Sequence, residues 1–137
     1  MDEESVAFEG ILGYALPGGW QVLVGRTDAA NDRLSLRIAR PRDRWFHVRG
    51  LPGSHVVLRV GEDAAPERAT LELAAAIAAY HSKARGAGTV PVSCTEARHV
   101  SKPRGAKPGT VAIRKEHVLK VRPLTDRAAA ALRAGPS

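Results

Sequence analysis

Apolar residues along the chain fall into short runs separated by glycine, proline and charged residues. Runs rich in β-branched and aromatic residues predict strands over residues 20–24, 45–48, 55–60, 89–94 and 97–100. The second and third runs are joined by residues 49–54, whose two glycines and proline favour a turn, so the two runs are expected to form a hairpin. Residues 111–113 and 118–121 predict a second hairpin around residues 114–117.

Helical spacing of apolar residues predicts three helices. The first covers residues 31–39, with Asn31 as its N-cap. The longest covers residues 67–83, and Gly86 suits its end. An alanine-rich run over residues 126–134 predicts the third helix.

Three features qualify the strand pattern. Residues 1–16 show little periodicity and predict either a weak strand or a loosely ordered lead-in. Pro91 cannot donate a ladder hydrogen bond, so it predicts either an edge strand or an irregularity. Trp45 and Phe46 are neighbours in a strand and point to opposite faces. We expect one of them in the core and the other exposed.

The order strand, helix, two strands, helix, strands and helix has no regular βαβ rhythm. It predicts an α+β fold with a largely antiparallel sheet, one long helix and short flanking helices. The 137 residues are expected to form a single domain, residues 1–137.

Three observations bear on location. The longest nearly uninterrupted apolar stretch, residues 71–80, is about half of the ~20 residues that a membrane span needs. Residues 1–4 are acidic where a leader would be basic, and the single Cys94 cannot form an intramolecular disulfide. The cytoplasm is therefore the expected location.

Lys and Arg number 21 against 14 Asp and Glu, which gives a formal net charge of +7. The excess lies in two segments: residues 26–60 carry eight arginines against three aspartates, and residues 91–122 carry eight basic residues against two glutamates. This excess, mostly arginine, favours an anionic partner such as nucleic acid. The two Trp, two Tyr and two Phe are too few for a broad base-stacking platform, so recognition of folded RNA through its backbone and shape fits better.

Catalytic and metal-binding patterns are weak. The five histidines do not follow zinc-binding spacing, and no acidic motif gathers carboxylates around a metal. His47 and His55 flank the predicted hairpin turn, where they could meet as ordinary hydrogen-bonded strand residues. Cys94 in a strand is most simply a small buried hydrophobe. We therefore expect no enzymatic activity, no cofactor and no metal.

Glycine and proline stand beside cations or hydroxyls in three loop segments. These are Pro52-Gly53-Ser54, Pro103-Arg104-Gly105 and Lys107-Pro108-Gly109. Such loops can bring backbone N–H groups against a phosphate. The alternative is that they are tight turns whose cations are simply solvated.

Four stretches together resemble the NFACT-R domain, the RNA-binding module of ribosome quality-control proteins of the NEMF and fibronectin-binding-protein A type. The longest is residues 45–59, which read Trp-Phe-His-Val-Arg-Gly-Leu-Pro-Gly-Ser-His-Val-Val-Leu-Arg. The others are Gly25-Arg26 followed by Asn31-Asp32-Arg33-Leu34, then Ala-Ala-Tyr-His-Ser-Lys-Ala-Arg at residues 78–85, and the Lys-Pro-Arg-Gly-Ala-Lys-Pro-Gly loop at residues 102–109. The match spans about residues 20–121, the expected core of the domain.

The resemblance implies a domain that engages tRNA and ribosomal RNA when a large ribosomal subunit stalls with its nascent chain. In full-length relatives the module is joined to an N-terminal NFACT domain and a coiled coil. The chain shows no sustained heptads, so a stand-alone RNA binder is the expectation.

The resemblance and the charge map select the same cations and hydroxyls for RNA binding. The expected site residues are Arg26, Arg49, Ser54, His55, Lys83, Arg85, Lys102, Arg104 and Lys107. We expect the hairpin turn, the end of the long helix and the Lys-Pro loop to meet in space, so that these residues form one anion-binding face.

Two other functions stay open. One is an RNA-processing or RNA-modifying component that uses His47, His55 or Asp43 as catalytic groups. The other is a protein adaptor on the ribosome that uses the helix at residues 67–83.

Overall fold

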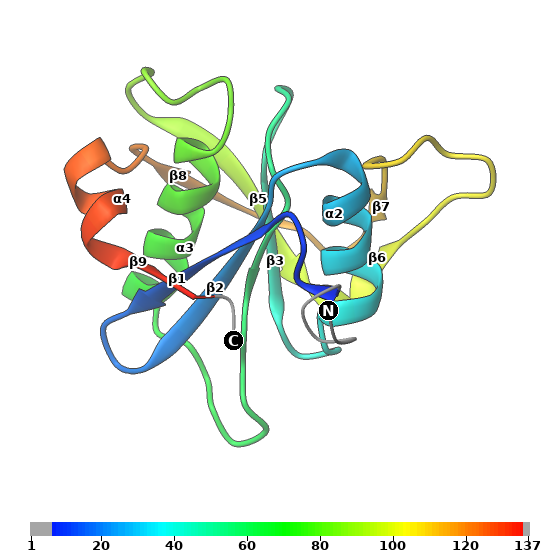
Figure 1. The fold of residues 1–137 in the computed structure, drawn as a ribbon, viewed down its shortest axis with the longest axis horizontal. Helices are drawn as coiled ribbons and strands as arrows, with labels where there is room; N and C mark the ends of the chain where they lie inside the picture. The colour runs from blue at the N-terminus through cyan, green and yellow to red at the C-terminus, as the bar shows by residue number, and fades with distance from the viewer. Residues whose placement is uncertain (1–6, 136–137) are drawn as a thin grey trace.

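A seven-stranded antiparallel sheet forms the centre of the protein, and the computed structural model describes residues 7–135 (Figure 1). Its strand order is β8-β5-β3-β4-β2-β1-β9. The strands are β1 (Ile11–Leu16), β2 (Trp20–Gly25), β3 (Arg44–Val48), β4 (Val56–Leu58), β5 (Val90–Glu96), β8 (His117–Val121) and β9 (Arg133–Ala134). The antiparallel sheet is therefore as predicted, and the lead-in before residue 16 ends in strand β1. The acidic residues 1–4 lie outside the described residues.

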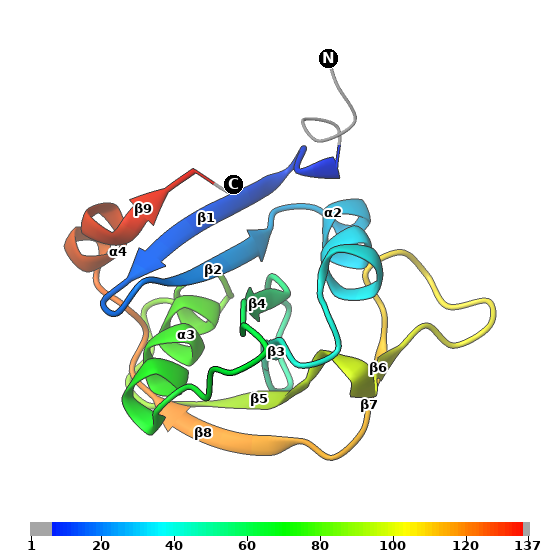
Figure 2. The same cartoon turned by 90° about the horizontal axis from the view of Figure 1, so that it is seen from below.

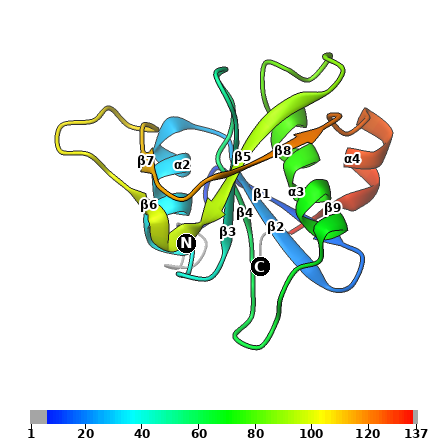
Figure 3. The same ribbon diagram turned by 180° about the vertical axis from the view of Figure 1, so that it is seen from behind.

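Helices cover both faces of the sheet. On one side lies α3 (Arg68–Tyr80), with α4 (Asp126–Leu132) beside it, and on the other lie α2 (Asp28–Arg33) and the π-helical turn η1 (Leu34–Ile38) (Figures 1 and 3). Two apolar cores result, because each face of the sheet buries its own set of side chains. None of the described helices is long and apolar enough to cross a membrane.

Trp45 and Phe46 lie in different cores. Phe46 packs in the core under α3, and Trp45 packs in the core under α2 and η1, where its indole Nε1 donates to Ser35 Oγ at 2.8 Å. Both side chains are buried. The expectation that one would be exposed is wrong, because the sheet has no uncovered face at β3.

The first helix begins earlier than predicted. Thr27 is the N-cap, since its Oγ1 accepts from the Ala30 N–H at 3.0 Å, and the helix starts at Asp28. Asn31 lies inside the helix, buried, where its Oδ1 accepts from the backbone N–H of His55 at 3.0 Å. Its short polar side chain therefore bonds a distant strand and not its own helix end.

The predicted long helix is also shorter, at 13 residues, and it ends at Tyr80. The chain after α3 is hydrogen-bonded to the turn of the β3–β4 hairpin. The Lys83 N–H donates to the Pro52 carbonyl at 3.1 Å, and the Ser54 N–H donates to the His81 carbonyl at 2.9 Å. Residues 81–83 therefore leave the helical path although their composition allows a helix. The C-terminal helix is confirmed over Asp126–Leu132.

The first predicted hairpin is confirmed and the second is wrong. Strands β3 and β4 pair with Phe46 opposite Val56. Residues after the Lys-Pro loop form β7 (Ala112–Ile113), which pairs with β6 (Val100–Ser101) in a separate small sheet, whereas β8 pairs with β5. The two segments separate because Ile113 packs on the core under α2 and Leu119 belongs to the core under α3. The predicted strand at residues 97–100 is mostly the 3-10 turn η2 (Ala97–His99).

Pro91 lies in an interior strand, because β5 runs between β3 and β8, so the edge-strand alternative is wrong. The pairing of β5 with β3 ends at Val92 opposite Val48, and Val92 is the residue next to the proline. The Pro91 carbonyl still accepts from the Arg49 N–H at 3.0 Å. The missing N–H therefore falls where the β3 ladder stops, which is the irregularity that proline tolerates.

Candidate nucleic-acid interface

The turn of the β3–β4 hairpin lies directly against the chain that leaves α3. Gly53 and Ser82 form an isolated antiparallel bridge, flanked by the two backbone hydrogen bonds of Ser54 and Lys83. These segments are 29 residues apart in sequence, yet the structure brings them together as the charge map requires. Figure 1 shows the hairpin turn, the chain after α3 and the start of α2 at the same edge of the molecule.

A cleft of about 380 Å³ opens where these segments meet α2. Three of the expected site cations line it: Arg26 from the end of β2, and Lys83 and Arg85 from the chain after α3. Its remaining lining is Thr27, Asp28, Asn31, Pro52, Gly53, Ser54, His81 and Ser82. Asp28 is the one acidic side chain in this lining, so the cleft carries an excess of positive charge.

The cations of the cleft differ in their own contacts. Arg85 lies over the Tyr80 ring, 4.0 Å from its centroid, and its Nε donates to the Tyr80 carbonyl at 2.6 Å. Among residues 7–135, no carboxylate pairs with the side chain of Arg26 or Lys83. These two cations are therefore available to an external anion, and Arg85 is held in place by an aromatic ring.

His81 is a cleft residue that the sequence did not single out. The hydroxyl of Tyr14 lies 2.6 Å from its Nε2. Burial first, and then the positive charges of Arg85, Arg133 and Arg26, lower the pKa of His81 to about 4. The ring is therefore neutral near pH 7, and in that state its Nε2 can accept a hydrogen bond from the Tyr14 hydroxyl. Its position within the Tyr-His-Ser-Lys stretch was the one available sequence signal.

Arg49 and Ser54 lie at the two ends of the hairpin turn. The guanidinium of Arg49 is 3.7 Å from a Glu116 carboxylate oxygen, so an internal carboxylate already neutralises part of its charge. Ser54 lines the cleft. Arg49 is thus a weaker candidate for an RNA contact than the cleft cations.

His55 lies beneath the surface, with 4% of the residue exposed. Its Nδ1 is 2.7 Å from Ser35 Oγ, and its ring centroid is 5.8 Å from that of His47, so the two histidines do meet. Burial first, and then the proximity of His47, lowers the pKa of His55 to about 4. A neutral, enclosed imidazole is placed to organise the interior and not to touch RNA.

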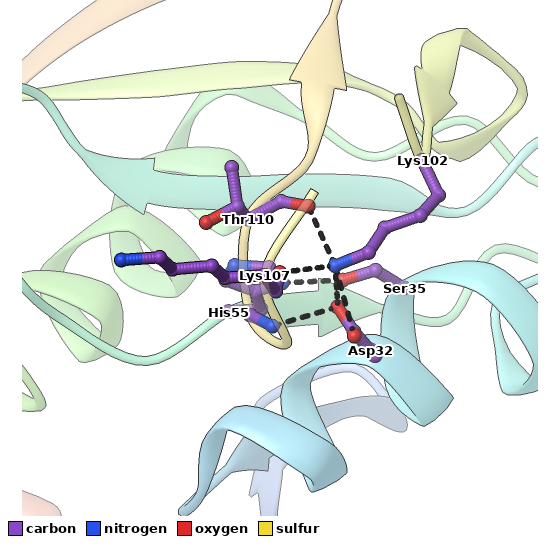
Figure 4. Close-up of polar contacts among 7 residues, drawn as sticks. Asp32, Ser35, His55, Lys102, Lys107 and Thr110 are labelled. Carbon is purple, nitrogen blue, oxygen red and sulfur yellow. Dashed lines mark hydrogen bonds and ion pairs between the residues drawn. The ribbon is translucent and has the colours of Figure 1, made fainter. Parts of the chain in front are cut away.

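The Lys-Pro loop between β6 and β7 extends from the body beside α2 (Figure 2). Arg104 and Lys107 are exposed on it, and neither side chain has a carboxylate partner among residues 7–135. Lys102 differs, because its ammonium lies 3.0 Å from Asp32 Oδ2 (Figure 4). Of these three expected RNA contacts, Lys102 therefore already has an internal carboxylate beside it.

The loop and the cleft border the same short helix. Gly109 packs against Asp28, since a Cβ built on Gly109 would lie 2.8 Å from an Asp28 carboxylate oxygen, and Asp28 also lines the cleft. The three expected stretches therefore meet around α2, with the hairpin turn and the end of α3 on one side and the loop on the other.

The structure shows the surroundings of Asp43 and of α3, which the two alternative functions would use. Asp43 is 1% exposed, accepts from the backbone N–H groups of Arg40 and Val60, and pairs with Arg59 at 3.3 Å. Residues 74–79 of α3 are buried against the sheet. The Asp43 carboxylate and these six of the 13 residues of α3 are therefore not presented to a partner.

A family model described as the NFACT protein RNA binding domain matches residues 14–115. The chain belongs to this family. The family match contains all four stretches that carried the resemblance, and in the structure one of them includes the end of α2 and the other three contribute segments that meet around it.

Relatives of this chain include two proteins named Rqc2 homolog RqcH. The chain is 44% identical over 113 residues to the one from Bacillus subtilis (strain 168), and 41% identical over 113 residues to the one from Streptococcus suis (strain 05ZYH33). Each alignment covers 82% of this chain, but only 19% and 20% of those proteins. The chain therefore spans about a fifth of the length of the curated relatives it matches.

A solved structure has the same fold. It is that of the C-terminal part of the fibronectin/fibrinogen-binding protein from Streptococcus suis (FBPS), with a TM-score of 0.83 and 35% sequence identity. The match covers 90% of this chain and 49% of that chain.

Proposed function

We propose that this chain binds structured RNA, either tRNA or ribosomal RNA, through phosphate contacts, and that it catalyses no reaction. The observation that carries the proposal is the cleft in which Arg26 and Lys83 stand without carboxylate partners among residues 7–135. Unpaired cations beside a polar cleft attract phosphate groups and release their counterions. Family membership supports the same class of ligand.

The proposed process is ribosome quality control, with the large ribosomal subunit as partner and the cytoplasm as location. Support comes from the relatives named Rqc2 homolog RqcH. Because the chain covers only about a fifth of those proteins, the proposal for this chain is limited to RNA contacts made in that process.

Binding to labelled tRNA and to a labelled ribosomal RNA hairpin, followed by fluorescence anisotropy over a range of salt concentrations, tests the proposal. With about six phosphates neutralised, the logarithm of affinity should fall with the logarithm of salt with a slope of about −4 to −5. An affinity that does not change with salt would contradict it. The same incubation, analysed on a gel, should leave the RNA uncleaved and unmodified.

A pair of double variants locates the site. Replacing Arg26 and Lys83 with Ala should weaken binding about 10-fold or more, because two phosphate contacts are lost. Replacing Arg37 and Arg40 with Ala removes the same charge near the far end of η1, away from the cleft. If both variants lose affinity equally, the cleft is not the binding site.

A further inference from the structure

The ammonium group of Lys102 has its donors fully occupied. It lies 3.0 Å and 3.3 Å from the two carboxylate oxygens of Asp32, 2.9 Å from the Thr110 carbonyl and within hydrogen-bonding distance of the Lys107 carbonyl (Figure 4). An ammonium group has three N–H donors and these are four acceptors. Nothing remains on Lys102 with which to bind a phosphate.

Asp32 holds the far end of the same loop. Its Oδ1 also accepts from the Gly109 backbone N–H at 3.0 Å. One carboxylate on α2 therefore ties residue 102, where the loop begins, to residue 109, where it ends. The pair is partly shielded from water, with 28% of the Lys102 side chain and 23% of the Asp32 side chain exposed.

Between these two ends, the loop is folded into turns of its own. The Ala106 N–H donates to the Pro103 carbonyl and the Thr110 N–H donates to the Lys107 carbonyl, each at 3.0 Å. The side chain of Lys107 points away from Asp32 in Figure 4. The cations between the tied ends, Arg104 and Lys107, are thus presented outward on a closed loop.

We propose that Asp32 and Lys102 form a clasp that positions this loop for RNA, so that Arg104 and Lys107 contact phosphate while Lys102 does not. This inference rests on the proposed function. It assigns an acidic residue a favourable role in binding a polyanion, which net charge alone does not predict. Asp32 and Lys102 are positioning residues. A loop that is already closed before RNA binds loses less conformational entropy on binding.

Electrostatic attraction and the clasp predict opposite effects of one substitution on RNA binding. Asp32→Ala raises the net charge by one, so electrostatic attraction alone would strengthen RNA binding. The clasp predicts a loss of at least 5-fold. The matched control is Asp63→Ala, which removes the same charge from the exposed turn between β4 and α3, outside the cleft and the loop, and should bind RNA equally well or more tightly.

A second pair of variants keeps the charge constant. Lys102→Arg retains a cation that binds phosphate well, but its planar guanidinium cannot reproduce the compact four-acceptor site. It should weaken binding about 3-fold to 10-fold, whereas Lys120→Arg, on β8 and outside the loop and the cleft, should bind like the unaltered protein. If Lys102→Arg binds as well as Lys120→Arg, the compact site around Lys102 is not needed for binding and the clasp is wrong.

Two further measurements distinguish positioning from a general loss of fold. In Asp32→Ala the salt slope should become shallower by about 1.5, since the two contacts of Arg104 and Lys107 are weakened together at ~0.7–0.9 each. The Gly109 amide should lose its protection from hydrogen exchange while the amides of β3 keep theirs. Unchanged slope and unchanged Gly109 protection would overturn the clasp.

The outcomes separate this inference from the function beneath it. If the unaltered protein shows no salt-dependent RNA binding, the proposed function fails. If the unaltered protein binds, the Arg26 and Lys83 double variant loses affinity, and Asp32→Ala behaves like Asp63→Ala, then only the clasp fails.

Discussion

Gly53 of the hairpin turn lies against Ser82 beyond α3, so closely that a Cβ built on the glycine would stand 2.8 Å from the serine Cβ. The same Cβ would lie 3.3 Å from the Ser82 backbone Cα. This contact joins two segments that each carry part of the candidate RNA-binding cleft. It explains why a glycine stands in the turn even though its backbone has no positive φ.

Gly53→Ala is therefore expected to push the hairpin turn away from the end of α3. The overlap should lower the free energy of unfolding by about 1–3 kcal/mol, and widening the cleft should weaken RNA binding. Urea denaturation and anisotropy measure the two effects. Gly86→Ala is the matched control, because a Cβ there would meet nothing within 4 Å. Equal stability of the two variants would show that the close approach is not important.

Asn31→Ala should be destabilising because of its bond across the core. The substitution leaves the buried N–H of His55 without its 3.0 Å acceptor, which costs about 1–3 kcal/mol. The comparison is Arg37→Ala on the exposed side of η1, where a change within ±0.5 kcal/mol is expected. Equal urea midpoints for the two variants would contradict a structural role for Asn31.

The stability of the protein should fall as the pH is lowered from about 6.5 to 4. The pKa of His55 is lowered to about 4 in the folded protein, whereas an unfolded histidine has a pKa near 6.5. The unfolded state therefore binds more protons in this window, and folding stability rises with pH until it levels off above pH 6.5. For His55 the full effect is about 3 kcal/mol. The pKa of His81 is lowered in the same direction.

Nuclear magnetic resonance titration of the histidine rings checks this directly. The ring signals of His55 and His81 should stay in their neutral positions down to about pH 5. Denaturant unfolding at pH 7, 6 and 5 should give a free energy that decreases in this order. A ring of His55 that titrates near pH 6.5 would contradict the interior position described above.

Cys94 should be unreactive in the folded protein. It is buried in the core under α3, and burial raises its pKa to about 11. At pH 7.5 the thiolate fraction is therefore ~1 in 3,000, and the thiol is shielded as well. A thiol reagent should label Cys94 slowly in buffer and rapidly in denaturing urea. Fast labelling without urea would show that this part of the core opens readily.

Local sequence pattern is enough to predict much of the fold. The β3–β4 hairpin follows from two β-forming runs around a Gly-Leu-Pro-Gly turn, and α4 follows from an alanine-rich run. These elements depend on interactions between residues close in sequence. The contact between the hairpin turn and the end of α3 could not be predicted from local pattern, because the two segments are distant in sequence. It was expected from the charge distribution and the family resemblance instead.

The sequence by itself determined the net charge, the turn residues and the segments that carry the cations. Tertiary structure decided which of those groups face the solvent. Lys102 and Arg104 belong to one loop and carry the same charge, yet only Lys102 meets a carboxylate, because α2 places Asp32 beside it. His55 is buried for a similar reason, since η1 sets Ser35 against its ring. A side chain's exposure and partners depend on distant segments packed against it, and local periodicity does not contain that information.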